Sequence, residues 1–91
     1  MKYSVDYTGR FKKSLKRCVK RGLDIKLLEQ AVAILIEQGG LPKTYKPHKL
    51  SGNMEGMWEC HITPDWLLVW LQNDNKLTLL MLDTGSHSDL F

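Results

Sequence analysis

Residues 57–71 have the sequence MWECHITPDWLLVWL, which predicts a β-hairpin. The first part alternates, so Trp58 and Cys60 can face the core while the residues between them face the other way. Residues 63–65, Thr-Pro-Asp, are typical of a turn. Residues 66–71 are almost entirely apolar, as expected of a central strand that is mostly buried. The segment therefore predicts two neighbouring antiparallel strands.

The chain before this hairpin predicts one strand and two helices. Residues 2–7 alternate with period two and indicate a strand, and Thr8 can cap the helix that follows. That helix carries one apolar stripe and ends at Gly22. Asp24 can cap a second helix, which the glycines at 39–40 stop. Because the turn between the helices is very short, we expect them to form an antiparallel hairpin.

The remaining segments complete a sheet. Residues 45–50 are short and irregular, and Pro47 restricts them to an edge strand or a loop. Residues 77–82 return as a further strand, which Gly85 ends. This order favours a single α+β domain over residues 1–91, with an N-terminal strand and an antiparallel helical hairpin packed on one face of an antiparallel β-sheet. The opposite face would be partly open, with room for a ligand.

The charges are divided unevenly along the chain. The net charge is +3, but residues 1–50 hold 12 of the 13 Lys and Arg and 4 of the 10 Asp and Glu, a balance of +8. Residues 51–91 hold 1 basic and 6 acidic residues, a balance of −5. Such asymmetry favours a polyanionic or acidic partner, and a solvated helix face is the alternative.

Other features favour a cytoplasmic protein. No apolar run approaches the roughly 20 residues of a membrane span, so no membrane association is expected. The first residues lack the apolar stretch of a signal peptide. Cys18 and Cys60 form no C-x-x-C pair, and we expect both thiols to be reduced and packed.

Three histidines, His48, His61 and His87, lie at predicted strand ends or in loops. Asp65 closes the turn after the strand of His61, so a hairpin would place both at the same end of the sheet, within side-chain reach. The other two histidines could join them from neighbouring segments. For each histidine alone, a structural or simply exposed position is the more common case.

Three kinds of chemistry fit such a cluster. In metal-free RNA cleavage, one group takes the 2′-hydroxyl proton, another protonates the 5′-oxygen, and cations stabilise the phosphate. A metal site made of His and Asp is the second, although no tight motif such as H-E-x-x-H supports it. The third is phosphate binding without chemistry, by the basic helix together with Lys43, Lys46 and Lys49.

Two aromatic residues could hold unpaired RNA by stacking on its bases. Trp66 begins the predicted central strand, and Phe91 is the last residue. Core packing is the more common position for a tryptophan in such a strand. Phe91 could instead anchor the C-terminal tail.

Three ordered motifs resemble those of one toxin family. Residues 45–52, YKPHKLSG, resemble the Y-K-x-H-x-L-x-G segment of YafQ-type toxins in the RelE superfamily. Residues 59–69, ECHITPDWLLV, resemble the H-x-x-P-D-W-L-L-I/V hairpin of these toxins. Residues 84–91, TGSHSDLF, are similar to their C-terminal T-G-[ST]-H-x-x-L-F. The spacing and length also match, and the basic helical hairpin is similar in pattern.

This resemblance implies an α+β fold of the microbial-RNase type and a ribosome-dependent endoribonuclease that cleaves mRNA with no metal and no cofactor. It also implies neutralisation by a cognate antitoxin. In such pairs the antitoxin is usually a small ribbon-helix-helix protein whose extended tail wraps the toxin, so the toxin would contact DNA only through it. The basic face of this chain would suit an acidic tail.

The resemblance further implies roles for individual residues. The catalytic set would be His48, His61, Asp65 and His87. We expect His87 and Asp65 to be the acid and the base, in either order, and the other two histidines to orient or stabilise the phosphate. The side chains expected to bind the RNA substrate are Lys46, Lys49, Trp66 and Phe91.

One position departs from the family pattern. Family members often carry an arginine just before T-G-[ST]-H, where this chain has Asp83. An arginine would donate hydrogen bonds to the transition-state phosphate, whereas a carboxylate repels it, and loss of one such donor commonly costs about 10²–10³ in rate. Either Lys46, Lys49 or a protonated histidine substitutes, or the enzyme is weak. The sequence alone therefore predicts that Asp83→Arg increases cleavage.

Three other functions stay open. A ParE-type toxin has the same fold but acts on DNA gyrase by binding, although ParE-like chains typically lack this histidine set. A catalytically impaired family member would serve mainly as a co-repressor with its antitoxin, which only Asp83 supports. A metal-dependent nuclease would lose its activity in a chelator.

Overall fold

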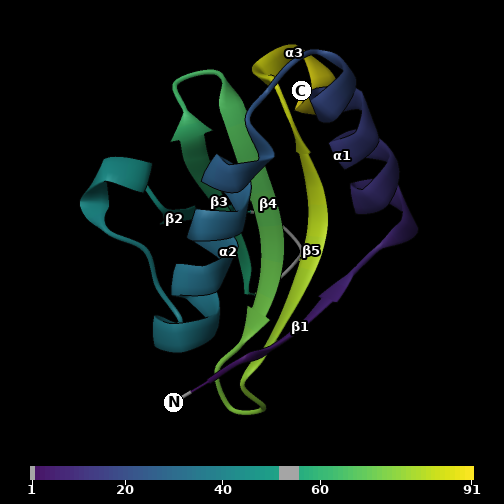
Figure 1. Cartoon of the computed structure of the whole chain (residues 1–91). Helices are drawn as coiled ribbons and strands as arrows, with labels where there is room; N and C mark the ends of the chain where they lie inside the picture. Colours follow the sequence, from purple (N-terminus) through teal and green to yellow (C-terminus); the bar gives the residue numbers. More distant parts are fainter. Residues whose placement is uncertain (1, 52–55) are drawn as a thin grey trace.

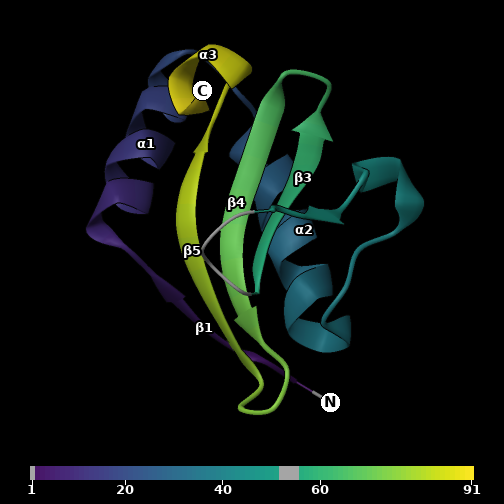
Figure 2. The same cartoon turned by 180° about the vertical axis from the view of Figure 1, so that it is seen from behind.

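The computed structural model describes residues 2–51 and 56–91, and Figures 1 and 2 show it from opposite sides. Gly52, the last residue of the first family motif, lies outside the described residues. The elements in chain order are β1 (Ser4–Tyr7), α1 (Gly9–Lys20), α2 (Ile25–Gln38), a short 3-10 helix (Lys43–Tyr45), β2 (His48–Lys49), β3 (Met57–Thr63), β4 (Trp66–Asn73), β5 (Thr78–Gly85) and α3 (His87–Leu90). Within the described ranges, no helix is long and apolar enough to cross a membrane.

The five strands form one sheet in the order β1-β5-β4-β3-β2. Strands β2 to β5 are an antiparallel meander, which confirms that part of the prediction. Strand β1, however, pairs with β5 in parallel, with Ser4 opposite Thr78 and Tyr7 opposite Met81. A wholly antiparallel sheet was therefore the wrong expectation for this edge. Two helices and three strands separate β1 from β5 in the chain, so no tight turn forces the two to run in opposite directions.

Both long helices begin at the caps that the sequence predicts. The side chain of Thr8 accepts a hydrogen bond from the backbone N–H of Phe11 at 3.0 Å, and Asp24 accepts one from that of Lys26 at 3.0 Å. Helix α2 ends at Gly39, whose φ of 68° is a left-handed conformation that glycine adopts without strain. The helices run in opposite directions, with α1 beside β5 and α2 over the middle of the sheet (Figure 1).

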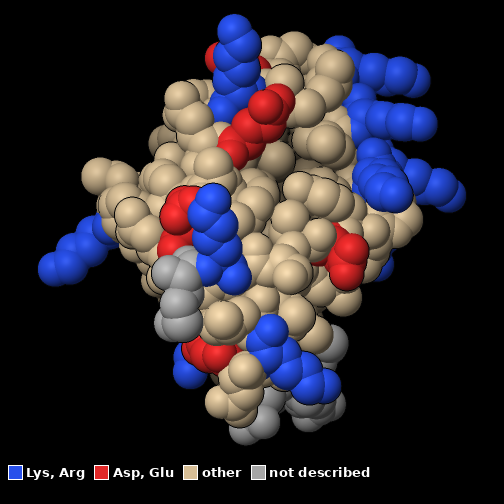
Figure 3. Space-filling model, turned by 60° about the horizontal axis from the view of Figure 1, so that its bottom comes forward, with Lys and Arg blue, Asp and Glu red and all other residues tan. Residues whose placement is uncertain are grey.

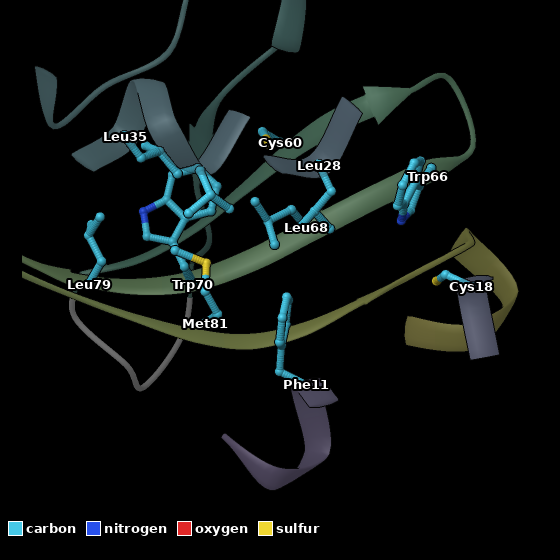
Figure 4. Close-up of a cluster of buried hydrophobic side chains, with 11 residues drawn as sticks. Phe11, Cys18, Leu28, Leu35, Cys60, Trp66, Leu68, Trp70, Leu79 and Met81 are labelled. Carbon is cyan, nitrogen blue, oxygen red and sulfur yellow. The ribbon is translucent and has the colours of Figure 1, made fainter. Parts of the chain in front are cut away.

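The hydrophobic core lies between the helices and one face of the sheet. Phe11 of α1 and Leu35 of α2 pack there with Trp66 and Trp70 of β4 and Met81 of β5, all of them buried (Figure 4). Seen from behind, strands β3 and β4 lie in front of α2, and β5 lies to the side, toward α1 (Figure 2). The predicted α+β fold, with both helices on one face of the sheet, is therefore confirmed.

The face of the sheet opposite the core, here called the second face, carries a row of paired residues. His48 lies opposite Glu59, Glu59 opposite Val69, and Val69 opposite Asp83. Directly paired residues project to the same side of a sheet, and neighbours along a strand project to opposite sides. The row therefore faces away from Cys60, which is in the core. It joins the edge strand β2 to the end of β5.

Candidate active site

His87 is held in place by Asp65. One oxygen of Asp65, in the turn between β3 and β4, accepts hydrogen bonds from Nδ1 of His87 at 2.6 Å and from its backbone N–H at 3.1 Å. The side-chain hydrogen bond, helped by the backbone one, holds the pKa of Asp65 below its ordinary value. Asp65 is therefore ionised near neutral pH. It fixes the orientation of the His87 ring and leaves Nε2 of that ring available.

His61 and His48 continue the cluster. The ring centroid of His61 lies 5.7 Å from that of His87 and 6.5 Å from that of His48. Nδ1 of His61 lies 3.3 Å from the carbonyl oxygen of Pro64 and must carry the hydrogen, because a carbonyl oxygen can only accept. Its Nε2 is then the nitrogen left for a ligand. The structure thus brings together the three histidines and Asp65 from separate segments.

Glu59 is a candidate that the sequence analysis missed. It is 5% exposed, and its Oε1 lies 3.2 Å from Nε2 of His48. Nδ1 of His48 donates to the carbonyl oxygen of Lys46 at 3.1 Å, so both ring nitrogens face oxygen atoms. Oε2 of Glu59 is buried and has no hydrogen-bond partner among the described residues, which is costly and typical of functional sites. Its position two residues before His61, on the same side of β3, was the available signal.

A short helix that the sequence did not predict, α3, positions His87. The hydroxyl of Ser86 accepts a hydrogen bond from the backbone N–H of Asp89, and the Asp89 carboxylate accepts one from that of Ser86. Both terminal nitrogens of Arg21 donate to the same carboxylate. The hydrogen bonds from Arg21 and from the Ser86 backbone hold the pKa of Asp89 well below its ordinary value. This pair ties the C-terminal helix to α1.

The two lysines expected to bind phosphate point in different directions. Lys46 lines a cavity of about 210 Å³ together with His61. Lys49 pairs with Trp58 on the side of the sheet opposite to His48, and its Nζ lies 5.7 Å from the centroid of the Trp58 ring. Because neighbours in a strand face opposite sides, Lys49 projects away from the histidine cluster, and the structure does not bring it to this site.

The two aromatic residues expected to stack on RNA bases differ in their exposure. Trp66 is 1% exposed, and its indole N–H donates to the hydroxyl of Thr84 at 2.9 Å, which donates in turn to the carbonyl of Leu67 at 2.7 Å. No base can reach this ring, so the predicted stacking on Trp66 is wrong and core packing is confirmed (Figure 4). Phe91 is 76% exposed, and its backbone N–H donates to the carbonyl of His87 at 2.9 Å.

Asp83, where family members often carry arginine, is buried, and its carboxylate accepts three hydrogen bonds. One oxygen accepts a hydrogen bond from Nε of Arg10 at 3.0 Å. The other accepts from the hydroxyl of Ser14 at 2.6 Å and from the backbone N–H of Thr84 at 2.9 Å. Its charge is therefore paired, and it is no free carboxylate facing a bound phosphate. A guanidinium group does lie at this position, supplied by α1 instead of β5.

The cluster is arranged for acid–base chemistry. Nε2 of His61 and of His87 has no hydrogen-bond partner among the described residues, and an imidazole can take or give a proton near neutral pH. In the part of the chain that the structure describes, no group of three or more His, Cys, Asp or Glu side chains is arranged to hold a metal ion.

Comparison with known proteins agrees with this fold. The family described as "Bacterial toxin of type II toxin-antitoxin system, YafQ" matches residues 3–91. The mRNA interferase toxin YafQ of Escherichia coli strain K12 is 34% identical over 88 residues, 96% of this chain and 94% of the relative.

Two solved structures are also similar. A chain of the E. coli DinJ-YafQ toxin-antitoxin complex has a TM-score of 0.91 and 33% identity, over 100% of this chain and 99% of that chain. A metal-bound toxin from Helicobacter pylori has a TM-score of 0.88 and 39% identity, over 98% and 99%. The matches extend over nearly the whole chain. This protein therefore belongs to the YafQ family of toxins of type II toxin-antitoxin systems.

Proposed function

We propose that this protein is an endoribonuclease that cleaves mRNA as the toxin of a toxin-antitoxin pair. Its 34% identical relative is an mRNA interferase toxin. The observation that carries the proposal is the pair formed by His61 and His87. Their Nδ1 atoms are engaged by Pro64 and Asp65, their ring centroids are 5.7 Å apart, and both Nε2 atoms are left for a substrate.

The reaction requires two proton transfers. One imidazole, in its neutral form, takes the proton of the 2′-hydroxyl as that oxygen attacks the neighbouring phosphorus. The other, protonated, gives its proton to the departing 5′-oxygen. The products are a 2′,3′-cyclic phosphate and a 5′-hydroxyl, and the two imidazoles have exchanged protonation states. Either order of His61 and His87 is consistent with their contacts.

In this scheme Asp65 is a positioning residue. Its lowered pKa leaves no proton to donate near neutral pH, and makes it a weak base. By accepting from both the ring and the backbone of His87, it presents Nε2 of that ring to the substrate. The acid–base pair is therefore His61 with His87, instead of His87 with Asp65.

The remaining side chains act on the phosphate and the base. His48 forms an ion pair with Glu59 when it is protonated, and a protonated ring stabilises the charge of the transition state. Lys46 adds a second cation beside His61. Phe91, exposed at the end of α3, stacks on an unpaired base.

We also infer the setting in which the toxin acts. It cleaves mRNA on the ribosome in the cytoplasm, and a cognate antitoxin of the ribbon-helix-helix type neutralises it and provides its only link to DNA. Family membership and the similarity to a chain of the DinJ-YafQ complex support this assignment. The excess of basic residues in the first half of the chain suits both RNA and an acidic antitoxin tail.

Cleavage of a defined mRNA on programmed ribosomes, in buffer that keeps magnesium and contains a chelator selective for transition metals, tests the proposal. The parent should cleave and leave 2′,3′-cyclic phosphate ends. His61→Ala and His87→Ala should each reduce the rate by about 10²–10⁴-fold, the usual contribution of a general acid or base. Lys26→Ala, at an exposed position of α2, is the matched control and should cleave like the parent.

Three results would each contradict one part of the proposal. Equal cleavage of free mRNA would contradict ribosome dependence, and loss of activity in a chelator selective for transition metals, with the ribosome's magnesium kept, would contradict a reaction free of such metals. A folded parent that cuts no RNA would contradict the endoribonuclease and favour a toxin that acts by binding.

A further inference from the structure

A second polar site shares α3 with the histidine cluster. It is a groove of about 620 Å³ between α1, the end of β5 and α3. Helix α3 borders both sites, since His87 belongs to the histidine cluster and Asp89 to the groove. The groove is lined chiefly by Arg10, Lys13, Ser14, Arg17, Asp83 and Asp89.

The cations of the groove are on one side of α1. Arg10, Lys13 and Arg17 follow one another at spacings of three and four residues, which places them on one face of the helix. Figure 3 shows several Lys and Arg side chains projecting together on the side of the molecule that α1 forms. The groove therefore presents a row of positive groups along its α1 wall.

The two carboxylates in the groove do not cancel this charge for a ligand. Asp83 is engaged by Arg10 and Ser14, and Asp89 accepts from Arg21, which lies next to the groove. Lys13 forms no ion pair with any described residue. Arg17 also lies 3.9 Å from Asp89, so two arginines share that carboxylate. The four cations Arg10, Lys13, Arg17 and Arg21 outnumber the two carboxylates, so the groove keeps a net positive charge.

The hydrogen bond to Asp83 fixes the orientation of the Arg10 guanidinium. Only Nε of its guanidinium donates to the carboxylate, at 3.0 Å, and the side chain is 76% exposed. The two terminal nitrogens have no hydrogen-bond partner among the described residues. Because Asp83 holds the guanidinium through Nε alone, the terminal N–H groups of Arg10 remain available to an anion in a fixed geometry. This geometry suits the oxygens of a phosphate.

The position of the groove relates it to the histidines. Asp83 ends the row of second-face residues that begins at His48 and passes through Glu59. A nucleic-acid strand whose reacting phosphate lies at the histidines could therefore continue past α3 and place a neighbouring phosphate against α1. Helix α3 contributes His87 to one site and Asp89 to the other, and this closeness to the histidines favours RNA as the occupant over an acidic peptide.

We propose that this groove binds a backbone phosphate of RNA outside the scissile position, with Arg10, Lys13 and Arg17 as donors and Asp83 as the residue that positions Arg10. The proposal rests on the proposed function, because it assumes that the strand held at the histidines is RNA. The phosphate can belong to the substrate strand or to ribosomal RNA, and the experiment distinguishes these two sources.

Binding is measured in a His87→Gln background, so that cleavage does not interfere. A short labelled single-stranded RNA and, separately, ribosomes without mRNA are titrated over a series of salt concentrations. Arg10→Gln, Lys13→Gln and Arg17→Gln should each weaken binding several-fold and flatten the dependence of log affinity on log salt by about 0.7, the value for one phosphate contact on a single strand. Lys12→Gln, an exposed lysine of α1 that does not line the groove, should change neither.

The pattern across the two RNAs identifies the source. Loss on the short RNA indicates the substrate strand, and loss on ribosomes alone indicates ribosomal RNA. Both support a phosphate site. Losses equal to that of Lys12→Gln, or losses only in binding of an acidic antitoxin tail, overturn the proposal.

A further variant tests the role of Asp83. Asp83→Asn adds one positive charge to the groove but weakens the contact that aims Arg10. Positioning predicts weaker RNA binding despite the added charge, and stronger binding overturns that role. Thermal unfolding of each variant shows whether a loss arises from unfolding.

The same variants separate this proposal from the proposed function. If the parent cleaves mRNA and the groove variants bind and cleave as well as it does, the groove proposal fails alone. If the parent cleaves nothing while the groove variants still lose RNA binding, the endoribonuclease fails and the RNA site stands.

Discussion

At the scale of single residues, the three histidines differ in what their second nitrogen faces. Both ring nitrogens of His48 face oxygen atoms, whereas His61 and His87 each have one nitrogen free of described partners. A general acid or base must reach the proton that it transfers. This difference assigns the proton transfers to His61 and His87, and the electrostatic role to His48.

The contrast between Trp66 and Phe91 gives a direct test of their roles. Trp66→Phe keeps most of the buried ring and removes its hydrogen bond to Thr84, so it should destabilise the fold by about 1 kcal/mol and leave cleavage per folded molecule unchanged. Phe91→Ala should reduce cleavage and leave stability unchanged. Denaturant unfolding and the ribosome assay measure the two effects, and a Trp66→Phe variant that is stable but inactive would contradict the core assignment.

The structure changes the outcome expected of Asp83→Arg. The carboxylate accepts three hydrogen bonds while nearly buried, and the substitution would leave Ser14 and Arg10 without their acceptor and place a second cation beside Arg10. We expect a lower unfolding midpoint and no gain in cleavage per folded molecule. Increased cleavage by a stable variant would favour the simpler idea that position 83 only lacks a donor.

At the scale of elements, the four-residue helix α3 is the part on which the site depends most. Its first residue is His87, its capping box uses Ser86 and Asp89, and Arg21 ties it to α1. An isolated helix of this length has no stability in water. The geometry of His87 therefore depends on contacts with α1 and with Asp65, and not on the helix itself.

Gly85→Ala should displace α3. Gly85 has a φ of 156°, which other residues rarely adopt, and an added Cβ would lie 2.7 Å from a carboxylate oxygen of Asp89. We expect loss of cleavage with the sheet intact. Gly40→Ala, where an added Cβ meets nothing within 4 Å, is the control and should cleave like the parent. Circular dichroism checks the fold, and equal activity of the two variants would contradict this role of α3.

The pair of Arg21 with Asp89 should make part of the stability depend on pH. The pKa of Asp89 is lower in the folded protein than in the unfolded chain, so its contribution is complete above the ordinary aspartate pKa of about 3.9 and is lost as the pH falls towards the folded value. Arg21→Gln should lower the unfolding midpoint at neutral pH, and its difference from the parent should shrink near about pH 2. A difference that is the same at both pH values would contradict the pair.

At the scale of the whole molecule, periodic patterns predicted the elements well, and contacts between distant segments were harder to predict. Thr8, Asp24 and Gly39 mark helix ends locally, so both helices could be placed from sequence. The parallel pairing of β1 and the docking of α3 depend on partners more than 60 residues away, such as Arg21 for Asp89. No local pattern carries that information.

In the candidate active site, too, local motifs were predictable from the sequence and contacts between distant segments were not. The family motifs gave the three histidines and Asp65, which the structure places together. The buried carboxylate of Glu59 and the pairing of Asp83 with Arg10 arise only when β3, β5 and α1 meet. Burial of a polar side chain depends on all its neighbours, so sequence spacing alone could not show it.

The reactivity of the two cysteine thiols tests the packing of the whole core. Both are fully buried, and burial raises the pKa of Cys60 to about 12 and also raises that of Cys18. Neither thiol should react with an alkylating reagent in the folded protein near neutral pH, and both should react in denaturant. Mass spectrometry counts the modified thiols, and rapid labelling of either one in the native protein would contradict the packing of the core.

The dependence of the cleavage rate on pH tests the central claim, that His61 and His87 form the acid–base pair. It is measured under single-turnover conditions on programmed ribosomes for the parent, His61→Ala and His87→Ala. The parent should give a bell-shaped profile, because one imidazole must be neutral and the other protonated, and each variant should lose one limb of the bell. A profile of unchanged shape in both variants would contradict the account, since the titrating groups would then lie elsewhere.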